Sequence, residues 1–377
     1  MKESKIDFYD TFSCIAGECS ITCCQEWKIE IDEETLSKWS AFQKQCEESL
    51  IEKVEERDGN KIMKLDEDKK CPYLTEQKLC KLVNKFGEES ISKTCKVFPR
   101  IVHEFSDRKE YSLTSCCPEV VDCLRRREQI TLIKEGNRES ISLLEEIRRN
   151  LVGIMQEKKI SVTNGFMIGF YMLLSFLEEK KLNKKSIKVY RKQEILNELQ
   201  GIIGEMEFHQ LDTFDECNEL LLDICDNYRK QNLYTAYLET IVKKAEDLLE
   251  GYEENWLEKK LKGFEKVLAG YEALIRNYIT IEIYNTFLLP DSNLENLIIM
   301  LQWIGMEYAV IRQALFLKWL ENDCEKLSYE EIRDYIVIIS RMTGYDQEDI
   351  YEYLKDSFQS VIWEWGYFAL MIGNCNF

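Results

Sequence analysis

The sequence predicts a mostly α-helical protein in which an irregular, cysteine-rich N-terminal module precedes an all-α domain. Two observations carry this prediction. Eleven of the fifteen cysteines and three of the four prolines lie before residue 135, where apolar residues occur only in short runs. Beyond that point, apolar residues recur with the spacing of an amphipathic helix. We therefore assign residues 1–135 to a metal-binding or iron–sulfur module and residues 136–377 to a helical domain.

Three stretches carry the helical pattern most clearly. They are Leu143, Leu144, Ile147 and Leu151; Leu220, Leu221, Ile224 and Tyr228; and Tyr271, Leu274, Ile275, Tyr278 and Ile281. Breaks between helices are expected where Gly, Pro or Asn interrupts the pattern, near 136–137, 183, 201–204, 289–291 and 343–344. Another helix is expected to begin after Ser328, because Glu331 three residues later completes a capping box.

Composition narrows the choice of partners and compartment. The net charge is −19 and no basic stripe is visible, so binding to nucleic acid is not expected. The chain opens without an apolar stretch of signal-peptide type. Its longest apolar segment, 165–177, is too short to cross a bilayer. We expect a cytoplasmic protein with no membrane span.

The N-terminal cysteines indicate metal chemistry. Thiols in the cytosol stay reduced, so a dense cysteine pattern favours metal binding over disulfides. Zinc and iron–sulfur clusters share thiolate ligands, and the spacing alone leaves both metals open. The predicted ligands are Cys14, Cys19, Cys23, Cys24, Cys71, Cys80, Cys95 and Cys117. Other cysteines are interpreted as small buried apolar residues: Cys46, Cys123, Cys217, Cys225, Cys324 and Cys375.

Proline placement sharpens the prediction at two of these positions. Cys71 and Cys117 each precede a proline, which biases the cysteine toward an extended backbone. Pro118 followed by Glu119 is a favourable helix start, so Cys117 is expected at or beside an N-cap. The helix dipole there favours thiolate over thiol. Cys24 ranks behind the other candidates, because adjacent cysteines seldom reach one metal with good geometry.

Several motifs together resemble a known family, the flagellin lysine-N-methylases, which are related to domains named for a CxxCxxCC signature. The matching blocks are Tyr9-Asp10-x-Phe12-x-Cys14-Ile15; Cys19-x3-Cys23-Cys24-x2-Trp27-x-Ile29-x-Ile31-Asp32; Cys71-Pro72-Tyr73-Leu74 with Leu79-Cys80; Thr94-Cys95-x2-Phe98-Pro99-Arg100; and Ser115-Cys116-Cys117-Pro118-Glu119. These blocks follow the family order over about the first third of the chain.

The resemblance implies methyl transfer from S-adenosylmethionine to lysine side chains of flagellin, with a [4Fe–4S] cluster held by the cysteines. The residues themselves do not reveal how the methyl donor is held. No Gly-rich loop of Rossmann type is present, and the CxxxCxxC triplet of common radical enzymes is incomplete, since Glu26 follows Cys19-x3-Cys23 at the third position. Eight cysteines are also too many for one four-iron cluster.

The sequence selects no catalytic residue. Arg100 is a candidate for pairing with a carboxylate of the methyl donor through its planar guanidinium, and a structural salt bridge is the alternative. Trp27, Tyr73 and Phe98 are candidate walls of an adenosine or lysine pocket, with core packing as the alternative. His103 and His209 are weak candidates for a general base.

Two other functions compete with the methyltransferase. One is a non-enzymatic module, stapled by zinc, whose helical domain serves as an adaptor or chaperone for a partner protein. The other is an iron–sulfur electron carrier, which is weaker because such a carrier has no need of so large a helical domain.

Overall fold

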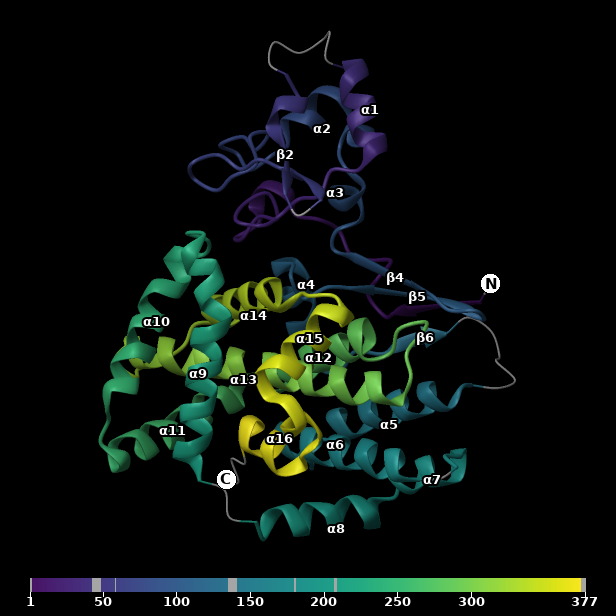
Figure 1. Ribbon diagram of the computed structural model, residues 1–377, viewed down its shortest axis with the longest axis vertical. Coiled ribbons are helices and arrows are strands. Elements are labelled where there is room, and N and C mark those ends of the chain that lie inside the picture. Colours follow the sequence, from purple (N-terminus) through teal and green to yellow (C-terminus); the bar gives the residue numbers. More distant parts are fainter. Residues whose placement is uncertain are drawn as a thin grey trace.

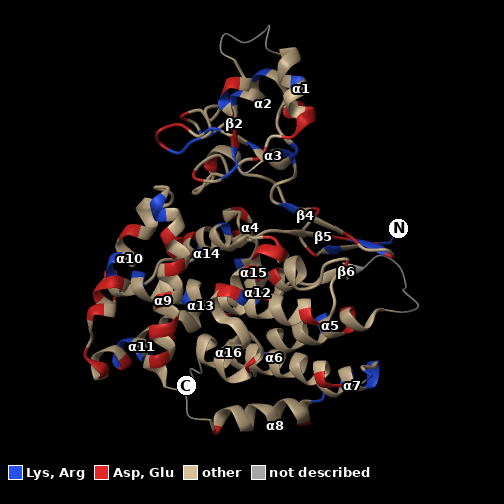
Figure 2. Cartoon of the chain, viewed as in Figure 1, with Lys and Arg blue, Asp and Glu red and all other residues tan. Residues whose placement is uncertain are grey.

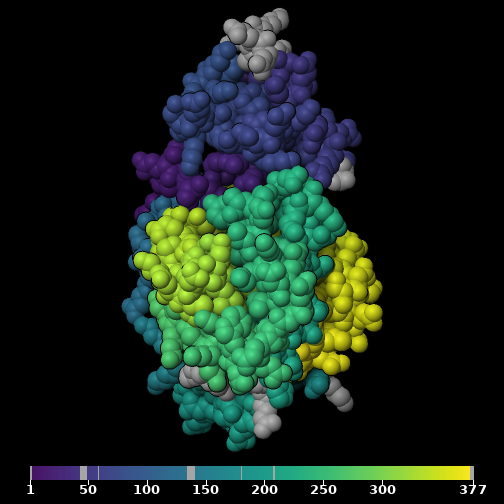
Figure 3. All heavy atoms as spheres, turned by 90° about the vertical axis from the view of Figure 1, so that its left-hand side faces the viewer, coloured from purple at the N-terminus to yellow at the C-terminus, as the bar shows by residue number. Residues whose placement is uncertain are grey.

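The computed structural model describes residues 2–42, 49–57, 59–134, 141–179, 181–206 and 209–373. A helical body carries a smaller lobe at one end (Figure 1). Seen from the side, the purple start of the chain lies between the blue lobe and the green helices (Figure 3). The described strands all precede residue 135 and the long helices all follow it, which confirms the predicted fold class.

A four-stranded sheet joins segments that are distant in the sequence. Its order is β4 (Arg100–Glu104), β5 (Arg108–Leu113), β1 (Lys2–Ile6) and β6 (Leu132–Lys134). β1 runs parallel to β5, with Lys2 opposite Arg108, and antiparallel to β6. β4 and β5 form an antiparallel hairpin. The start of the chain is therefore an inner strand.

The small lobe has a hydrophobic core of its own. Its elements are α1 (Glu33–Phe42), η3 (Ile51–Lys53), β2 (Val54–Arg57), β3 (Asn60–Met63), α2 (Lys81–Phe86), η4 (Glu88–Ser90) and α3 (Lys93–Val97). Its buried core residues are Ile29, Ile31, Trp39, Leu50, Met63, Cys71, Tyr73 and Leu82. The Trp39 indole donates to the Ser90 carbonyl at 2.7 Å, which ties α1 to η4.

Short elements lead from this lobe to the body. η1 (Ala16–Glu18) lies in the first cysteine segment, and α4 (Pro118–Arg125) begins immediately after Cys117. α4 packs against α12 (Glu272–Glu282) and α14 (Tyr329–Thr343). Its apolar residues Val120, Val121 and Leu124 are fully buried in the main core, so the second half of the cysteine-rich region is built into the body.

The helical body contains the remaining elements. They are α5 (Leu143–Gln156), α6 (Val162–Glu178), α7 (Lys184–Val189), α8 (Gln193–Gly204), α9 (Gln210–Lys230), α10 (Thr235–Glu250), α11 (Glu254–Leu268), η5 (Ala269–Tyr271), η6 (Ile283–Phe287), α13 (Leu294–Glu321), α15 (Gln347–Phe358), η7 (Gln359–Trp363) and α16 (Trp365–Ile372), with α12 and α14. Acidic and basic side chains are interspersed along α9, α10 and α11 (Figure 2).

α13 is the central helix of this body. It packs against α6, α9, α10, α14 and α16. By length and composition it is also the one described helix that could cross a membrane, but 83% of its most apolar window is buried inside the fold. Burial on all sides explains why it lacks an amphipathic pattern. A helix in the centre of a protein core can be as long and as apolar as a transmembrane helix.

Most of the predicted helix boundaries are found. Ser328 caps α14 with Glu331 completing the capping box, and Asn183 caps α7. α14 ends at Thr343, and α13 begins after the 289–291 break. The break predicted near 201–204 is found at the end of that range, because α8 ends at Gly204. The break predicted at 136–137 lies outside the described residues.

Candidate functional site

Four of the predicted ligand cysteines pack around the core of the small lobe. Cys71 is buried in that core, and Cys24, Cys80 and Cys95 pack against it. Backbone contacts fix their arrangement. The Cys71 amide donates to the Cys24 carbonyl at 2.8 Å, and Cys80 forms a β-bridge with Leu74, which closes the 71–80 turn. Cys95 lies on α3, which Ser92 caps by accepting from the Cys95 amide.

The other four predicted ligands lie beside the first group. Burial raises the pKa of the Cys19 thiol, and the nearby Cys23 and Cys14 thiols raise it further. Burial likewise raises the pKa of Cys117, with Cys19 and Cys23 as additional causes. Cys23 links the two groups, because it interacts with the Cys24 thiol and with Cys71. Five separate segments thus bring eight thiols into one electrostatically connected cluster, here called the thiol cluster.

The most buried thiols of the cluster are held in the protonated form when no metal is bound. Burial raises the pKa of Cys71 to about 12 and that of Cys95 to about 11. Cys117 does occupy the N-cap of α4, with Pro118 at the first helical position. Burial raises the pKa of Cys117 to about 12 and outweighs the backbone amides of Val120 and Glu119 at the start of α4, which lower this pKa as expected of a helix N-terminus.

The cysteine thiols are suitable ligands for a metal that binds thiolates, although their side chains do not surround a metal-binding position. Within the described ranges, no group of three or more His, Cys, Asp or Glu side chains is positioned to hold a metal ion. All cysteines in those ranges are free, so the thiols are chemically available. Thiolates are the shared ligands of zinc and iron–sulfur clusters.

The described cysteines that are interpreted as packing residues have contacts of their own outside this cluster. Cys217 and Cys225 are buried on α9, and the Cys217 thiol donates to the Met371 carbonyl at 3.2 Å. Cys123 is buried on α4, where Arg126 donates to its sulfur. Cys324 accepts from Lys260 at 3.1 Å. Cys46 and Cys375 lie outside the described residues.

A pocket of about 430 Å³ lies where the cysteine-rich region meets the helical body. Trp27 and Phe98 line it from the N-terminal side, and Trp303 and Ile304 line it from α13. Arg100 also lines it, with its guanidinium over the rings of Tyr9 and Phe12. The structure therefore brings Arg100, Trp27 and Phe98 to one cavity. Tyr73 lies elsewhere: its hydroxyl donates to the Leu50 carbonyl in the lobe core.

Two buried carboxylates that the sequence reading did not identify also line this pocket. Glu282, the last residue of α12, accepts from the Ser115 hydroxyl at 2.5 Å. The Ser115 and Ser340 hydroxyl oxygens lie 3.2 Å apart, within hydrogen-bonding distance, and Ser340 donates to Glu307 at 3.1 Å. Glu307 on α13 accepts from the Tyr278 and Thr343 hydroxyls as well. A chain of hydroxyls thus connects the two carboxyl groups.

Burial controls the charge of this pair. Burial, followed by the charge of the neighbouring Glu307, raises the pKa of Glu282 to about 8. Burial also raises the pKa of Glu307, which its three hydroxyl donors lower. Two like charges in a water-poor site oppose each other's ionisation. At neutral pH the pair therefore does not carry two full negative charges.

Arg341 connects the pocket to the thiol cluster. From α14, its guanidinium lies 4.9 Å from the Trp27 ring centre. It donates to the carbonyls of Ile21 at 3.0 Å, Thr22 at 3.3 Å and Cys116 at 2.9 Å. Those carbonyls lie one or two residues before Cys23 and Cys117. A single buried cation therefore holds both cysteine segments against the wall of the pocket.

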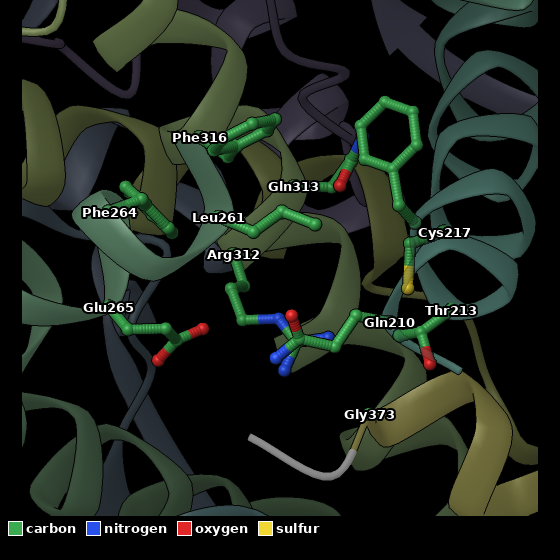
Figure 4. A pocket seen from close by; sticks show the side chains of 11 residues that line it. Gln210, Thr213, Cys217, Leu261, Phe264, Glu265, Arg312, Gln313, Phe316 and Gly373 are labelled. Carbon is green, nitrogen blue, oxygen red and sulfur yellow. The ribbon is translucent and has the colours of Figure 1, made fainter. Parts of the chain in front are cut away.

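The two histidines that were candidates for a general base do not lie in the 430 Å³ pocket. His103 contacts the Asn285 carbonyl at 2.7 Å, and burial lowers its pKa. His209 precedes α9 as its N-cap, and neither histidine lines a described pocket. A second pocket, bounded by α9, α11 and α13, includes Arg312 and Cys217 (Figure 4). Its volume of about 30 Å³ accommodates only a water molecule or two, so it is too small for a nucleoside.

Comparison with known proteins supports one family. The model of the FliB lysine N-methylase C-terminal domain matches residues 148–371. The flagellar biosynthetic protein FliU of Salmonella muenchen is 32% identical over 119 residues, which cover 30% of this chain and 70% of FliU. A lysine-N-methylase of Salmonella typhimurium is 31% identical over 119 residues, 30% of each chain.

The match to that lysine-N-methylase thus spans less than a third of its length. No solved structure matches this chain. The family model, in contrast, covers more than half of the chain and includes α6, α9, α13 and α14, the helices that form most of the body. This protein belongs to the FliB lysine N-methylase family.

Proposed function

We propose that this protein transfers methyl groups from S-adenosylmethionine to lysine side chains of flagellin in the cytoplasm, using a [4Fe–4S] cluster held by its cysteines. One observation carries the proposal: the thiol cluster lies beside a 430 Å³ pocket. Arg341 lines this pocket and donates to the carbonyls of Ile21 and Cys116, which lie close to the ligand cysteines in the chain. Family membership makes lysine methylation the relevant reaction. The name of FliU, a flagellar biosynthetic protein, supports flagellin as the substrate.

The cluster ligands would come from the thiol cluster. Cys71, Cys80, Cys95 and Cys24 surround one apolar core, and Cys14, Cys19, Cys23 and Cys117 form the adjoining group. A four-iron cluster with one iron free of thiolate could bind the amino and carboxylate groups of S-adenosylmethionine. Arg100 and Arg341 line the neighbouring pocket, where a guanidinium can pair with a carboxylate.

Purification without oxygen tests the metal. We expect a brown protein containing iron and sulfide, and a colourless protein with stoichiometric zinc would refute the cluster. Cys95→Ala should abolish loading if Cys95 is a ligand. Cys225→Ala is a matched control, because Cys225 is a buried cysteine outside the thiol cluster.

The reaction is tested separately. The loaded protein is incubated with flagellin, S-adenosylmethionine and a reductant, and flagellin is weighed by mass spectrometry. Additions of 14 Da per methyl group (the mass of CH₂) are expected on lysine-containing peptides. An unchanged flagellin mass, with iron and sulfide content intact, would refute the enzyme.

A zinc-stapled adaptor is the second candidate, and the size of the lobe favours it. The lobe core contains eight buried residues, among them Cys71. Cores this small usually need a disulfide or a structural metal. Under this alternative, a chelator would unfold the lobe and flagellin would remain unmodified.

A further inference from the structure

We propose that Glu282, Glu307 and Asn285 form the receptor for the substrate lysine, binding its ammonium group, and that the carboxyl pair takes its proton before methyl transfer. This inference rests on the proposed function, which supplies the lysine. The motifs that resemble the family lie in the first third of the chain, whereas these residues come from α12, η6 and α13.

The pocket has the shape and polarity that a lysine side chain requires. At its rim, Val97 and Tyr345 are 40% and 44% exposed. Its lining includes the aromatic side chains of Trp27 and Trp303, and its buried floor carries the carboxyl groups of Glu282 and Glu307. Lysine has a four-carbon apolar stem ending in an ammonium group. Aromatic side chains in the lining match the stem, and the buried acidic groups match the ammonium group.

An unpartnered acceptor at the same place points to a cationic ligand. Asn285 is 3% exposed and lines the pocket. Its amide nitrogen donates to the Leu113 carbonyl at 3.1 Å, while its side-chain oxygen has no hydrogen-bond partner. A buried acceptor left unpaired costs about 1–3 kcal/mol, so such a group needs an explanation. An ammonium group has three N–H donors and no acceptor, which fits this oxygen and two carboxyl groups.

Local backbone geometry places Asn285 beside Glu282. Asn285 follows Glu282 by three residues, which brings the two side chains to the same face of the helix. The segment Ile283–Phe287 is a π-helical turn, a rare conformation that is frequent at functional sites.

The charged and titratable groups around the pair fit a proton acceptor. Tyr278 and Cys116 face it, and burial raises the pKa of both, so they remain neutral. Arg341 directs its guanidinium toward backbone carbonyls. The Ser115–Ser340 hydroxyl chain lets a proton be shared between Glu282 and Glu307. A carboxyl pair whose ionisation falls near neutral pH is well matched to this task.

The reaction then balances. The ammonium group transfers one proton to the carboxylate pair and becomes a neutral amine. The amine forms an N–C bond with the methyl group of the sulfonium donor, and the C–S bond breaks with its electron pair moving to sulfur. The products are a methylated ammonium group, a thioether and a protonated carboxyl group.

Binding of n-butylammonium, a mimic of the lysine side chain, tests the receptor without methyl transfer. The purified full-length protein is titrated at pH 8 with n-butylammonium or the neutral n-butanol, and dissociation constants are measured by ligand-observed NMR. We expect n-butylammonium to bind at least about tenfold more tightly than n-butanol. Equal affinities, or no binding of n-butylammonium, would overturn the proposal, and this wild-type comparison requires no variant to fold.

Two variants then test whether Glu282 is responsible for the tighter binding of n-butylammonium. Glu282→Gln keeps the shape and the hydrogen-bonding capacity but removes the charge, and it should abolish the preference for n-butylammonium. Glu295→Gln, on the exposed first turn of α13, should leave the preference unchanged. Retention of the preference in folded Glu282→Gln would contradict the assignment.

Methylation of flagellin provides the second measurement. Glu282→Gln should lower kcat by at least about 100-fold at unchanged iron content, and it should remove the ionisation near pH 8 from the pH profile. If the wild type binds n-butylammonium but does not methylate flagellin, the proposed function fails and the cation site stands. If Glu282→Gln methylates flagellin as fast as the wild type, the proposed function stands and the assignment of the lysine receptor fails.

Discussion

Replacing Glu110 by Gln should destabilise the main body more than any surface change. Glu110 on β5 accepts from Arg108 at 2.5 Å and from Arg148 at 2.8 Å, which joins the sheet to α5. All three side chains are almost completely buried. Removal of one partner from a buried ionic group leaves uncompensated charge and costs about 3–5 kcal/mol. We expect this loss in the free energy of unfolding at pH 7.

The pKa of Glu110 gives a second, independent value for the stabilisation energy. Burial tends to raise this pKa, but the charges of Arg148 and Arg108 outweigh it and lower the pKa from 4.5 to about 2. Because the folded-state pKa is the lower one, the stabilisation is present above the unfolded pKa and is lost as the pH falls toward 2. The gap corresponds to about 3 kcal/mol, at roughly 1.4 kcal/mol per pH unit. This value agrees with the lower end of the energy expected for removing one partner of a buried ion pair.

Urea denaturation followed by circular dichroism measures this loss. Glu104→Gln is the matched control, because Glu104 pairs with Lys109 on the exposed side of the same hairpin. Its effect should stay within about 1 kcal/mol. Between pH 4.5 and 2, wild-type stability should fall by about 3 kcal/mol more than that of Glu110→Gln. A loss below about 1 kcal/mol for Glu110→Gln at pH 7 would refute the reasoning.

Three further predictions concern the site and its supports. Arg341→Met should leave buried carbonyls unpaired, lower stability by about 2–4 kcal/mol in thermal melts, and reduce metal retention, whereas full retention would argue against its role as a tether. Gly305→Ala should cost about 1–3 kcal/mol in urea unfolding, because a Cβ there would lie 2.8 Å from Phe368; an unchanged midpoint would show that α16 can shift. Asp32→Ala should lower the stability of the lobe by about 1–2 kcal/mol, since Asp32 accepts from the Lys93 amide at 2.8 Å as well as capping α1. Hydrogen exchange confined to the lobe measures that effect, and uniform protection would contradict it.

The sequence was informative where structure is determined locally. Proline after Cys117 predicts the N-cap of α4, and Ser328 with Glu331 predicts the start of α14; both are found. The helical domain follows from apolar periodicity, and the family from short cysteine motifs. Each of these signals extends over fewer than about twenty residues.

The floor of the pocket could not be predicted in this way. Glu282 and Glu307 meet only because α12, α13 and the Ser115 loop pack together, and such packing between distant segments leaves no spacing rule. A weaker signal was present: Glu307 is the only charged residue in the apolar run 297–311. An acidic residue is seldom fully buried without a partner, so its isolation there marks it as functional or paired.

The parallel pairing of β1 with β5 determines when the thiol cluster can form. Lys2 pairs with Arg108, so β1 remains without a partner until more than one hundred further residues have been synthesised. Contacts this distant in sequence form slowly, because a long loop must close first. β5 leads directly to Cys117, so the same closure brings Cys117 to Cys19 and Cys23. The first cysteine segment therefore acquires its partners late in folding, and a newly made chain carries it as an open loop of reactive thiols.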